Sequence, residues 1–345
     1  AVLVDPDRFS SARGVGLYDV EAGAPRKPSA ILELDPPDHT ASRRVMNRLL
    51  SPRALDEMRS AFERTARTVV DAAIARGDVD AIADIAFPFP FTVLPDVVGL
   101  RTDGREHLAT YSLMYFDTRA PDTERAAVSL MAAREAGSID WVLEQCRREH
   151  LVPGKFGDRL YQAADAGEIT ADTAEGLVRS FLGAGIDTTV LVIGTLLLQL
   201  AADPRQWQLL RDDPSLVRPA FDEALRWAPA AALVARTTSG EVDLEGVHIG
   251  ADQRIVCLMA AANRDPRRWE RPDEFDVTRD TAGQLGFGIG PHFCVGHALA
   301  RLESECLLTE LVRRVESIEL TGEPEALVNN WLLGPSRVPV RLHSA

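Results

Sequence analysis

One cysteine of this chain stands in a context that suits metal chemistry. Cys294 lies in the segment F-G-I-G-P-H-F-C-V-G-H-A-L-A-R, which runs from residue 287 to residue 301. Four glycines surround it: Gly286, Gly288, Gly290 and Gly296. They predict a backbone that bends sharply or passes very close to a large group. A helix is predicted to begin just after Cys294, and the N–H dipoles at a helix start favour a thiolate.

The loop around Cys294 is a poor candidate for a metal cluster held by several side chains. A lone cysteine is most often a small buried hydrophobe. Metal sites built by the protein normally recruit several Cys or His residues at short spacing, whereas this loop offers one Cys with apolar neighbours. A single thiolate suits the axial position of a haem iron, because the porphyrin supplies the other four donors. We therefore predict that Cys294 binds a haem iron.

The residues of this loop carry a family resemblance. The pattern Phe287-x-x-Gly290-x-His292-x-Cys294-x-Gly296, followed by Ala300 and a helix, resembles the haem-thiolate loop of cytochrome P450 monooxygenases. The resemblance implies that Cys294 is the proximal ligand of haem b and that His292 contacts a haem propionate. It also implies that Phe287 packs against the thiolate, and that Gly288 and Gly296 lie against the cofactor.

Three further cations are candidates for the propionates. His39 and Arg43 stand in D-P-P-D-H-T-A-S-R-R, and their i, i+4 spacing puts both on one helix face. That face is either simply solvated or, as the resemblance implies, turned to the haem. Arg236, in a predicted strand, is the third cation. Several cations facing two carboxylates is favourable electrostatics.

An E-x-x-R motif lies about 70 residues before the cysteine loop. Glu223 and Arg226 at i and i+3 share a helix face and can pair. A surface ion pair is the ordinary interpretation, and the family resemblance implies a structural pair instead. Family members often add an arginine from a later P-x-x-F motif. Here that motif has Glu274 at the corresponding place, so another arginine must complete the network.

A second chemical centre is predicted within the most apolar helix. The segment A-G-I-D-T-T places Gly185, Asp187 and Thr188 where buried polar groups are costly unless hydrogen-bonded. A threonine that bonds back to the preceding turn is the structural alternative. The segment resembles the family's oxygen-activation motif. That implies that Thr188 positions dioxygen and water at the iron, that Asp187 relays protons, and that Gly185 lies against the cofactor.

The substrate is suggested by a closer resemblance. The segments S-A-R-G-V-G-L (11–17), L-E-x-D-P-P (32–37) and L-V-R-S (177–180) resemble bacterial family members that oxidise para-substituted benzoates. The resemblance implies that Arg13 and Ser180 bind the carboxylate of a small aromatic acid. Gly183, Ala184 and Val234 are the predicted wall residues.

Helical geometry and two departures bear on this substrate site. Ser180, Ala184 and Thr188 form one stripe of a helix, and eight residues of rise span about 12 Å, room for a substituted benzoate. Arg179 points away from that stripe in an ideal helix, so we expect it behind the site. Arg119 stands where an aromatic wall is expected, and the segment A-P-A-A-A (228–232) has small residues where bulkier ones would press on the ring. These departures predict a roomier pocket, a longer acid or an altered orientation.

The elements that must position these groups are mainly helical. Before residue 230 the apolar spacing predicts helices, and short strand-like runs follow until the final long helix near 295–315. The expected fold is mainly α with a smaller β part, a single domain over 1–345. The family resemblance makes it the cytochrome P450 fold, a triangular helical prism around a buried haem. The chain opens on Ala1, and we expect that an N-terminal segment is missing.

Composition excludes several partners and adds others. The net charge of −14 argues against nucleic acid and anionic lipid. The longest apolar run, 190–202, is too short to span a membrane, and four scattered cysteines indicate a reducing cytoplasm. No nucleotide-binding fingerprint is present, so electrons must come from another protein. We expect an iron–sulfur ferredoxin with its reductase, docked near Arg267, Arg268 and Arg271.

The predicted function is therefore a haem-thiolate monooxygenase. It would use O₂ and two electrons to hydroxylate or O-demethylate a small aromatic carboxylic acid. One alternative keeps the family and changes the substrate to a terpene or other apolar natural product, against which Arg13 and Ser180 speak. A peroxide-using enzyme is disfavoured by Asp187 and Thr188. A haem-binding protein without turnover is the alternative from a different class.

Overall fold

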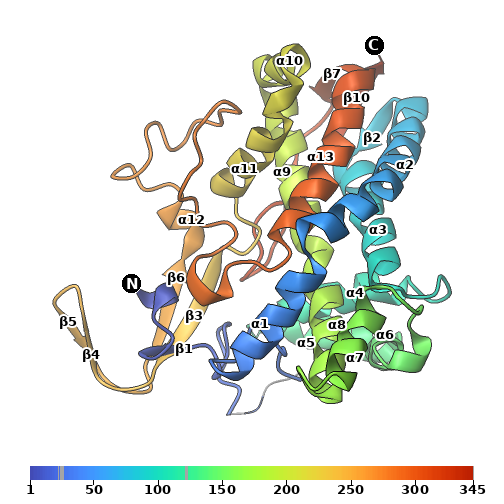
Figure 1. Cartoon of the computed structure of the whole chain (residues 1–345). Coiled ribbons are helices and arrows are strands. Elements are labelled where there is room, and N and C mark those ends of the chain that lie inside the picture. The colour runs from blue at the N-terminus through green and yellow to red at the C-terminus, as the bar shows by residue number, and fades with distance from the viewer. Residues whose placement is uncertain (22, 24–26, 121–122, 345) are drawn as a thin grey trace.

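The computed structural model describes the whole chain except residues 22, 24–26, 121–122 and 345. Its helices make up most of the molecule (Figure 1). They are α1 Asp38–Leu49, α2 Pro52–Arg76, α3 Pro88–Val98, α4 His107–Asp117, α5 Glu124–Glu135, α6 Ser138–Gln145, α7 Phe156–Asp165, α8 Ala171–Gly185, α9 Asp187–Ala202, α10 Pro204–Asp212, α11 Val217–Trp227, α12 Met259–Ala262 and α13 His297–Arg314. Short helical turns are η1 Val2–Val4, η2 Ala81–Ala86, η3 Arg148–His150, η4 Pro214–Leu216 and η5 Gly290–His292.

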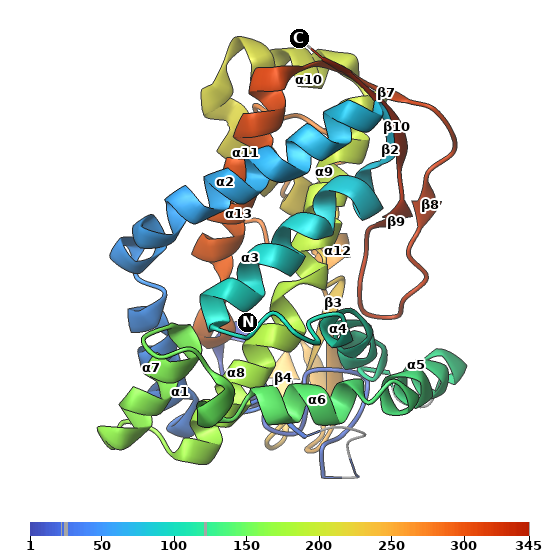
Figure 2. The same cartoon turned by 90° about the vertical axis from the view of Figure 1, so that its right-hand side faces the viewer.

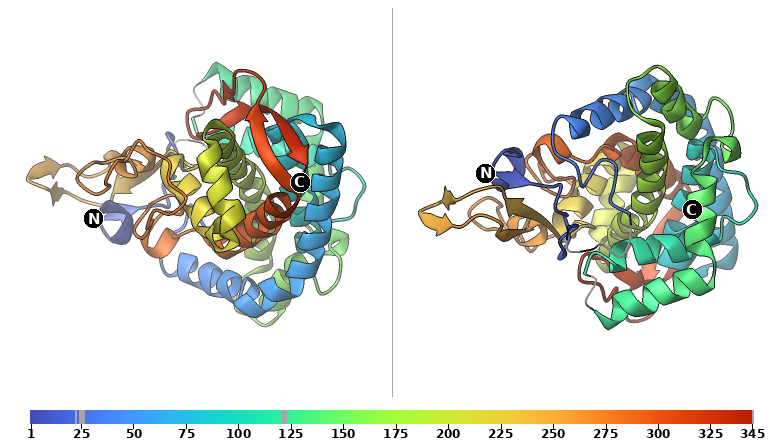
Figure 3. Two further views of the ribbon diagram at one scale, coloured as in Figure 1. Left: turned by 90° about the horizontal axis from the view of Figure 1, so that it is seen from above. Right: turned by 90° about the horizontal axis from the view of Figure 1, so that it is seen from below.

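The strands form small antiparallel sheets at two places. They are β1 Phe9–Ser10, β2 Asp78–Asp80, β3 Leu233–Thr238, β4 Val242–Leu244, β5 Val247–Ile249, β6 Arg254–Leu258, β7 Val315–Leu320, β8 Glu325–Ala326, β9 Pro335–Arg337 and β10 Pro339–Ser344. One sheet has the order β1-β3-β6 and another β2-β10-β7, while β4 pairs with β5 and β8 with β9. The β4–β5 hairpin projects away from the helical body (Figure 3).

The helix α2 shows how the sequence sets these elements. Pro52 occupies its first turn, where the missing N–H costs nothing. Its buried residues recur at helical spacing, among them Leu55, Phe62 and Ala66. The chain then leaves the helix at Gly77, whose φ of 75° favours glycine. The buried face of α2 packs against α3 and against α13, which α2 crosses in Figure 2.

The centre of the molecule is crossed by α8 and α9. The sequence predicts one long helix from about residue 172 to residue 202, and the structure interrupts it at Ile186. Asp203 ends α9 and caps α10, because its side chain accepts from the Arg205 N–H at 3.1 Å. A single apolar core of buried residues extends from Val15 to Leu342.

Among the residues that the structure describes, two helical stretches are apolar and long enough to cross a membrane by composition. They are Ala81–Val98 and Ala171–Ala202, and 78% of the apolar window of the second is buried inside the protein. A buried core helix passes the same test, and the central place of α8 and α9 gives them that role. The apolar length is thus accounted for by packing. All four cysteines are free thiols.

The beginning of the chain differs from the prediction. A short helix is expected over residues 3–9, whereas the structure has one 3₁₀ turn, η1, followed by β1. Phe9 and Ser10 pair with Thr238 and Thr237 of β3. The pairing covers one edge of β3, which explains why this segment is extended.

Candidate active site

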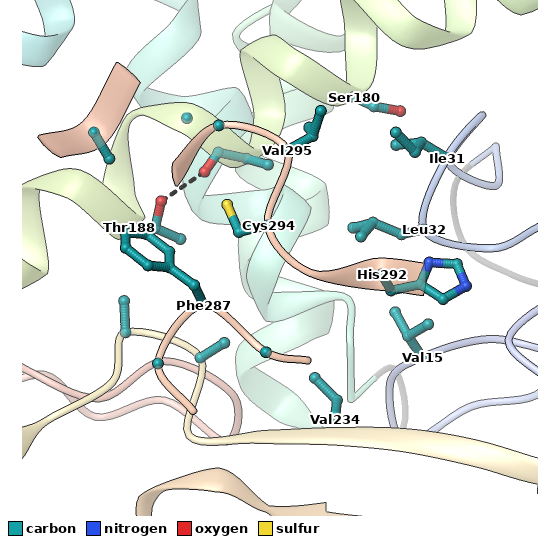
Figure 4. Close-up of a pocket in the computed structure, with 18 of the residues that line it drawn as sticks. Val15, Ile31, Leu32, Ser180, Thr188, Val234, Phe287, His292, Cys294 and Val295 are labelled. Atoms are coloured by element: carbon teal, nitrogen blue, oxygen red, sulfur yellow. Dashed lines mark hydrogen bonds between the residues drawn. The ribbon is translucent and has the colours of Figure 1, made fainter. Parts of the chain in front are cut away.

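The loop before α13 brings Cys294 to a cavity. The Cys294 N–H donates to the Phe287 carbonyl at 2.8 Å, so the loop closes back on itself. Gly288 and Gly290 lie at φ values of 72° and 75°, which side chains rarely adopt. A Cβ at Gly290 would come within 2.4 Å of the Leu3 carbonyl oxygen. These glycines therefore allow the turn that presents the sulfur to the cavity (Figure 4).

The side chains around Cys294 are those expected from its loop. Phe287, Gly288 and Gly296 all line the same cavity. The Arg301 guanidinium lies 4.8 Å from the centre of the Phe287 ring and fixes that ring. Burial raises the pKa of the Cys294 thiol, while the Gly296 N–H and nearby arginines lower it. A thiolate here is therefore best stabilised by a metal cation bound to it.

Thr188 lies on another wall of this cavity, at the start of α9. Its hydroxyl donates to the Ala184 carbonyl at 2.8 Å (Figure 4), and the Thr189 hydroxyl donates to the Gly185 carbonyl at 3.0 Å. These bonds accompany the break at Ile186. The structural interpretation of the threonines is thus correct for this state. It also leaves a hydroxyl on the cavity wall.

Two glycines next to the break are explained by close packing. A Cβ at Gly185 would lie 2.7 Å from the Leu94 side chain, and one at Gly183 would lie 2.8 Å from the Tyr115 ring. Gly185 and Ala184 line the cavity, as does Val234. Gly183 is not among the lining residues, because the Tyr115 ring covers it. The prediction of Gly183 as a substrate wall is therefore corrected.

Asp187 is buried beside this cavity. One carboxyl oxygen accepts from the Ser112 hydroxyl at 3.2 Å, and the other has no hydrogen-bond partner among the described residues. Burial, with a smaller contribution from Asp117, raises the pKa of Asp187 to about 7, although the Ser112 bond opposes the rise. Asp187 can therefore hold or release a proton near neutral pH.

A cationic cluster, made of two arginines and two histidines, lines the opposite end of the cavity. It contains His39, Arg43, Arg236 and His292. The two imidazole rings lie 4.1 Å apart, and both nitrogens of His292 lack hydrogen-bond partners among the described residues. Burial first, and then the neighbouring cations, lower the pKa of His292 to about 3.

No described carboxylate forms an ion pair with this cluster. The charge of Asp35 acts on His39 of the cluster. The Asp35 carboxylate, however, accepts hydrogen bonds from the Ser10 hydroxyl at 2.5 Å and from the Ser11 N–H at 2.8 Å. Arg43 donates to the Phe293 carbonyl instead. Buried cations without counter-charge are costly. The cluster therefore fits a ligand that brings two carboxylates, as the haem propionates do.

The Ser180 hydroxyl forms a polar pair on the cavity wall. It lies 2.9 Å from the Ser29 hydroxyl, and both residues are buried. Arg179 reaches the carbonyls of Lys27 and Pro28 at 2.8 and 2.7 Å, and so holds the segment that carries Ser29. Arg179 forms no ion pair with any described carboxylate. Its charge supports the serines from behind, as the helical geometry predicted.

Arg13 does not reach this site. Its guanidinium forms ion pairs with Asp19 and Asp252, and its Nε lies 3.5 Å from Glu21. Arg13 is not among the residues that line the cavity. The expectation that Arg13 binds the substrate carboxylate is corrected for this reason. Ser29, which no motif singled out, lies beside Ser180.

The E-x-x-R pair is a buried structural pair. The Arg226 Nε donates to Glu223 at 2.7 Å, and both side chains are fully buried. Arg226 also donates to the Pro272 carbonyl at 2.8 Å and the Glu274 carbonyl at 3.2 Å. The third member of the network is Arg279, whose Nε lies 3.2 Å from Glu223. The network ties α11 to the loop that leads to Cys294.

Comparison with known proteins agrees with this arrangement. The cytochrome P450 family model matches residues 206–339. The chain is 44% identical over its full length to cytochrome p450 CYP199A2 of Rhodopseudomonas palustris, and the match covers 84% of that protein. It is 33% identical to 6-deoxyerythronolide B hydroxylase of Saccharopolyspora erythraea, over 89% of this chain and 76% of the hydroxylase. A crystal structure of a mutant of P450 EryK in complex with erythromycin B has a TM-score of 0.85 at 28% identity, covering 100% of this chain and 88% of that one.

The Cys294 thiol, the cationic cluster and the Thr188 hydroxyl line one cavity within this helical fold, an arrangement that fits a haem-thiolate monooxygenase. The chain belongs to the cytochrome P450 family. Its cofactor is haem b, and its fold is the P450 fold.

The residues present fit this cofactor. Cys294 would ligate the iron, and the unpaired cations would hold the propionates. When bound, haem b supplies the activation of O₂ with two electrons. The chain's own contribution lies beside it: Asp187 holds a proton near neutral pH, and Thr188 presents a hydroxyl to the cavity. The apolar walls exclude bulk water from the reacting carbon.

Sequence reasoning missed three polar residues of this site. Ser29 and Glu303 are buried at or beside the cavity, and the Ser112 hydroxyl donates to Asp187. Burial raises the pKa of Glu303 to about 8. None of the three stands in a motif that marks it. Arg119, which lines the cavity, was identified only as a departure from the expected aromatic wall.

Proposed function

We propose that this P450 hydroxylates or O-demethylates a small aromatic carboxylic acid of the para-substituted benzoate type. The observation that carries the proposal is the buried Ser29–Ser180 hydroxyl pair, 2.9 Å apart, of which Ser180 lines the cavity and Ser29 lies behind it. Each hydroxyl can rotate, so a carboxylate that reaches Ser180 from the cavity can accept a hydrogen bond in place of the bond between the two serines. The positive charge of Arg179 behind them favours an anion over a neutral group.

The remaining walls suit a flat apolar body. Side chains of Ile31, Leu32, Phe116 and Val234 line the cavity between the serines and the loop of Cys294. Such a pocket fixes a ring by burial and leaves orientation to the few polar groups. A carboxylate held at Ser180 would then direct the para substituent along the helix towards Thr188. This order of groups supports oxidation at the para position.

The proposal is tested by binding and product analysis with 4-methoxybenzoate. We expect the acid to shift the ferric Soret band of the haem-loaded protein and to release formaldehyde on turnover. Ser180→Ala and Ser29→Ala should each weaken binding about tenfold, since a hydrogen bond to a charged group is lost. Arg13→Gln is the matched control, because Arg13 lies outside the cavity, and should leave the affinity unchanged.

Two results would contradict the proposal. One is equal affinity for 4-methoxybenzoate and its neutral analogue 4-methylanisole, because then the carboxylate is not recognised. The other is a loss of affinity in Arg13→Gln that matches the loss in Ser180→Ala. Binding of a terpene with no acid group, tighter than that of any benzoate, would favour the apolar-substrate alternative.

We also propose that an iron–sulfur ferredoxin and its reductase supply the electrons, in the cytoplasm, where the four free cysteines would persist. Of the expected docking arginines, Arg267 pairs with Asp265 and Arg271 with Glu274. Arg268 forms no ion pair with a described carboxylate. Arg268→Glu should therefore slow reduction and flatten its salt dependence, with Arg267→Glu as the weaker control. Equal reduction rates in both variants and the wild type would refute this docking site.

A further inference from the structure

Arg119 is a buried arginine on the wall of the active-site cavity. It follows the end of α4, and only 1% of the residue is exposed to solvent. Its guanidinium lies 4.8 Å from the centre of the Tyr115 ring and 5.6 Å from that of the Trp331 ring. All three side chains line the cavity. Stacking on two rings fixes the plane of the guanidinium, so its donors have defined directions.

The guanidinium is only partly hydrogen-bonded. Its Nη1 donates to Glu33 at 2.9 Å and lies 3.4 Å from the Tyr18 hydroxyl. The Nε–H of Arg119 finds no acceptor among the residues that the structure describes, although it is buried. A buried charged donor without an acceptor is rare and costly. An acceptor supplied by a ligand in the cavity would remove that cost.

The same network connects Arg119 to the proposed carboxylate site. The Glu33 carboxylate accepts from Arg119 through one oxygen and from the Ser29 N–H at 2.6 Å through the other. Ser29 in turn meets Ser180. A substrate acid bound by the two serines therefore lies next to the Glu33–Arg119 pair. One small aromatic acid could therefore place its carboxylate at the serines and a second polar group of its ring at Arg119.

The charges of the network decide what that second group is. Glu33 already balances the positive charge of Arg119, so the pair is neutral as a whole. A second carboxylate beside it would add an uncompensated negative charge next to Glu33 in a desolvated site. A neutral oxygen acceptor, such as a methoxy, hydroxyl or carbonyl oxygen, would accept the Nε–H without that penalty.

We propose that Arg119 is a specificity-determining residue that donates its Nε–H to a neutral oxygen substituent on the substrate. Resting on the proposed function, this makes the substrates aromatic acids with an oxygen acceptor in addition to the carboxylate and the group that is oxidised. Arg119 replaces the apolar wall that would otherwise accept a plain alkylbenzoate.

The test is calorimetric titration of the haem-loaded protein with a matched set of acids. The reference is 4-methylbenzoate, and its 2-methoxy and 3-methoxy derivatives each add one neutral acceptor. We expect at least one derivative to bind about tenfold more tightly than the reference, and 4-methylisophthalate, with a second carboxylate, to bind more weakly. Arg119→Lys retains an ammonium for Glu33 but lacks the Nε–H, and should remove the preference while changing the affinity for 4-methylbenzoate less than about threefold.

The outcomes separate this inference from the proposed function. If 4-methylbenzoate binds but neither methoxy derivative binds more tightly to the wild type, the role of Arg119 is refuted and the proposed function stands. A preference that persists in Arg119→Lys also refutes it, as does tighter binding of 4-methylisophthalate. If no benzoate binds, the proposed function fails and this inference fails with it. The comparison within the wild type needs no variant to fold.

Discussion

Replacing Asp187 by asparagine should make the folded protein more stable at alkaline pH while it lowers turnover about 100-fold. The pKa of Asp187 rises from 3.8 to about 7 on folding, mainly through burial. Folded protein thus keeps the proton to higher pH than the unfolded chain does. The carboxyl therefore costs stability progressively as pH rises from about 4 to about 7, and the cost is constant above that range. Asparagine is close in shape and never ionises.

The magnitude follows from the two pKa values. Fully developed above pH 7, the cost of Asp187 is about 4 kcal/mol. Between pH 6 and pH 8 the free energy of unfolding of Asp187→Asn should gain about 1.4 kcal/mol relative to the wild type. Glu303, whose pKa burial raises to about 8, contributes equally to both proteins and cancels in the difference.

The assay is urea unfolding of the haem-loaded proteins at pH 6 and pH 8, followed by circular dichroism. Turnover of Asp187→Asn should fall about 100-fold, the usual effect of losing a proton-transfer group. Ser112→Ala is the companion variant, because the Ser112 hydroxyl lowers the pKa of Asp187. Without that hydroxyl the pKa of Asp187 should rise further, so the loss of stability should continue to higher pH. The difference in free energy of unfolding between Asp187→Asn and the wild type should widen from pH 6 to pH 8. A difference that stays constant or narrows would show that the pKa of Asp187 is not raised towards neutrality in the folded protein.

Three further outcomes follow from the geometry. Arg279→Leu should destabilise the protein by about 3 kcal/mol in urea unfolding, since Glu223 loses one of its two buried guanidinium partners; no loss would mean that Arg226 alone suffices. Gly183→Ala should cost about 1–3 kcal/mol in the same assay, because the new methyl group meets the Tyr115 ring at 2.8 Å, and an unchanged midpoint would show that the ring moves freely. Cys294→Ser should remove the strongly red-shifted Soret band of the reduced carbon monoxide complex, and retention of that band would exclude Cys294 as the ligand.

Local patterns were enough to predict most elements near the site. Alternation and turn residues predict strands at 233–238, 242–244, 247–249 and 254–258, which are the bounds of β3, β4, β5 and β6. The apolar spacing predicts a helix at 52–76, which is α2. The break at Ile186 was not predicted, because it depends on two threonine hydroxyls that donate hydrogen bonds to carbonyls of the preceding helical turn. The helices α3 and α10 were also missed. The first is Pro-rich, a composition that argues against a helix in isolation.

The candidate site divides in the same way. Cys294 and its glycines are contiguous, so the sequence alone identified them. Ser29 and Arg119 come from segments about 90 residues apart and meet only through Glu33. No periodicity or spacing encodes such a meeting. Arg13 had a suggestive motif, but a surface arginine takes the acids that tertiary structure places around it, and these were Asp19 and Asp252.

The distribution of charge around the cavity gives the site its direction. On the Cys294 side the cationic cluster lacks carboxylate partners among the described residues, so it gains most from a ligand that carries two negative charges. On the Thr188 side two buried acids, Asp187 and Glu303, have pKa values raised towards neutrality by burial. An anionic cofactor edge is therefore stabilised at one end, whereas protons are retained at the other. A chain with these two ends reversed would repel the propionates and hold no proton where Thr188 presents its hydroxyl.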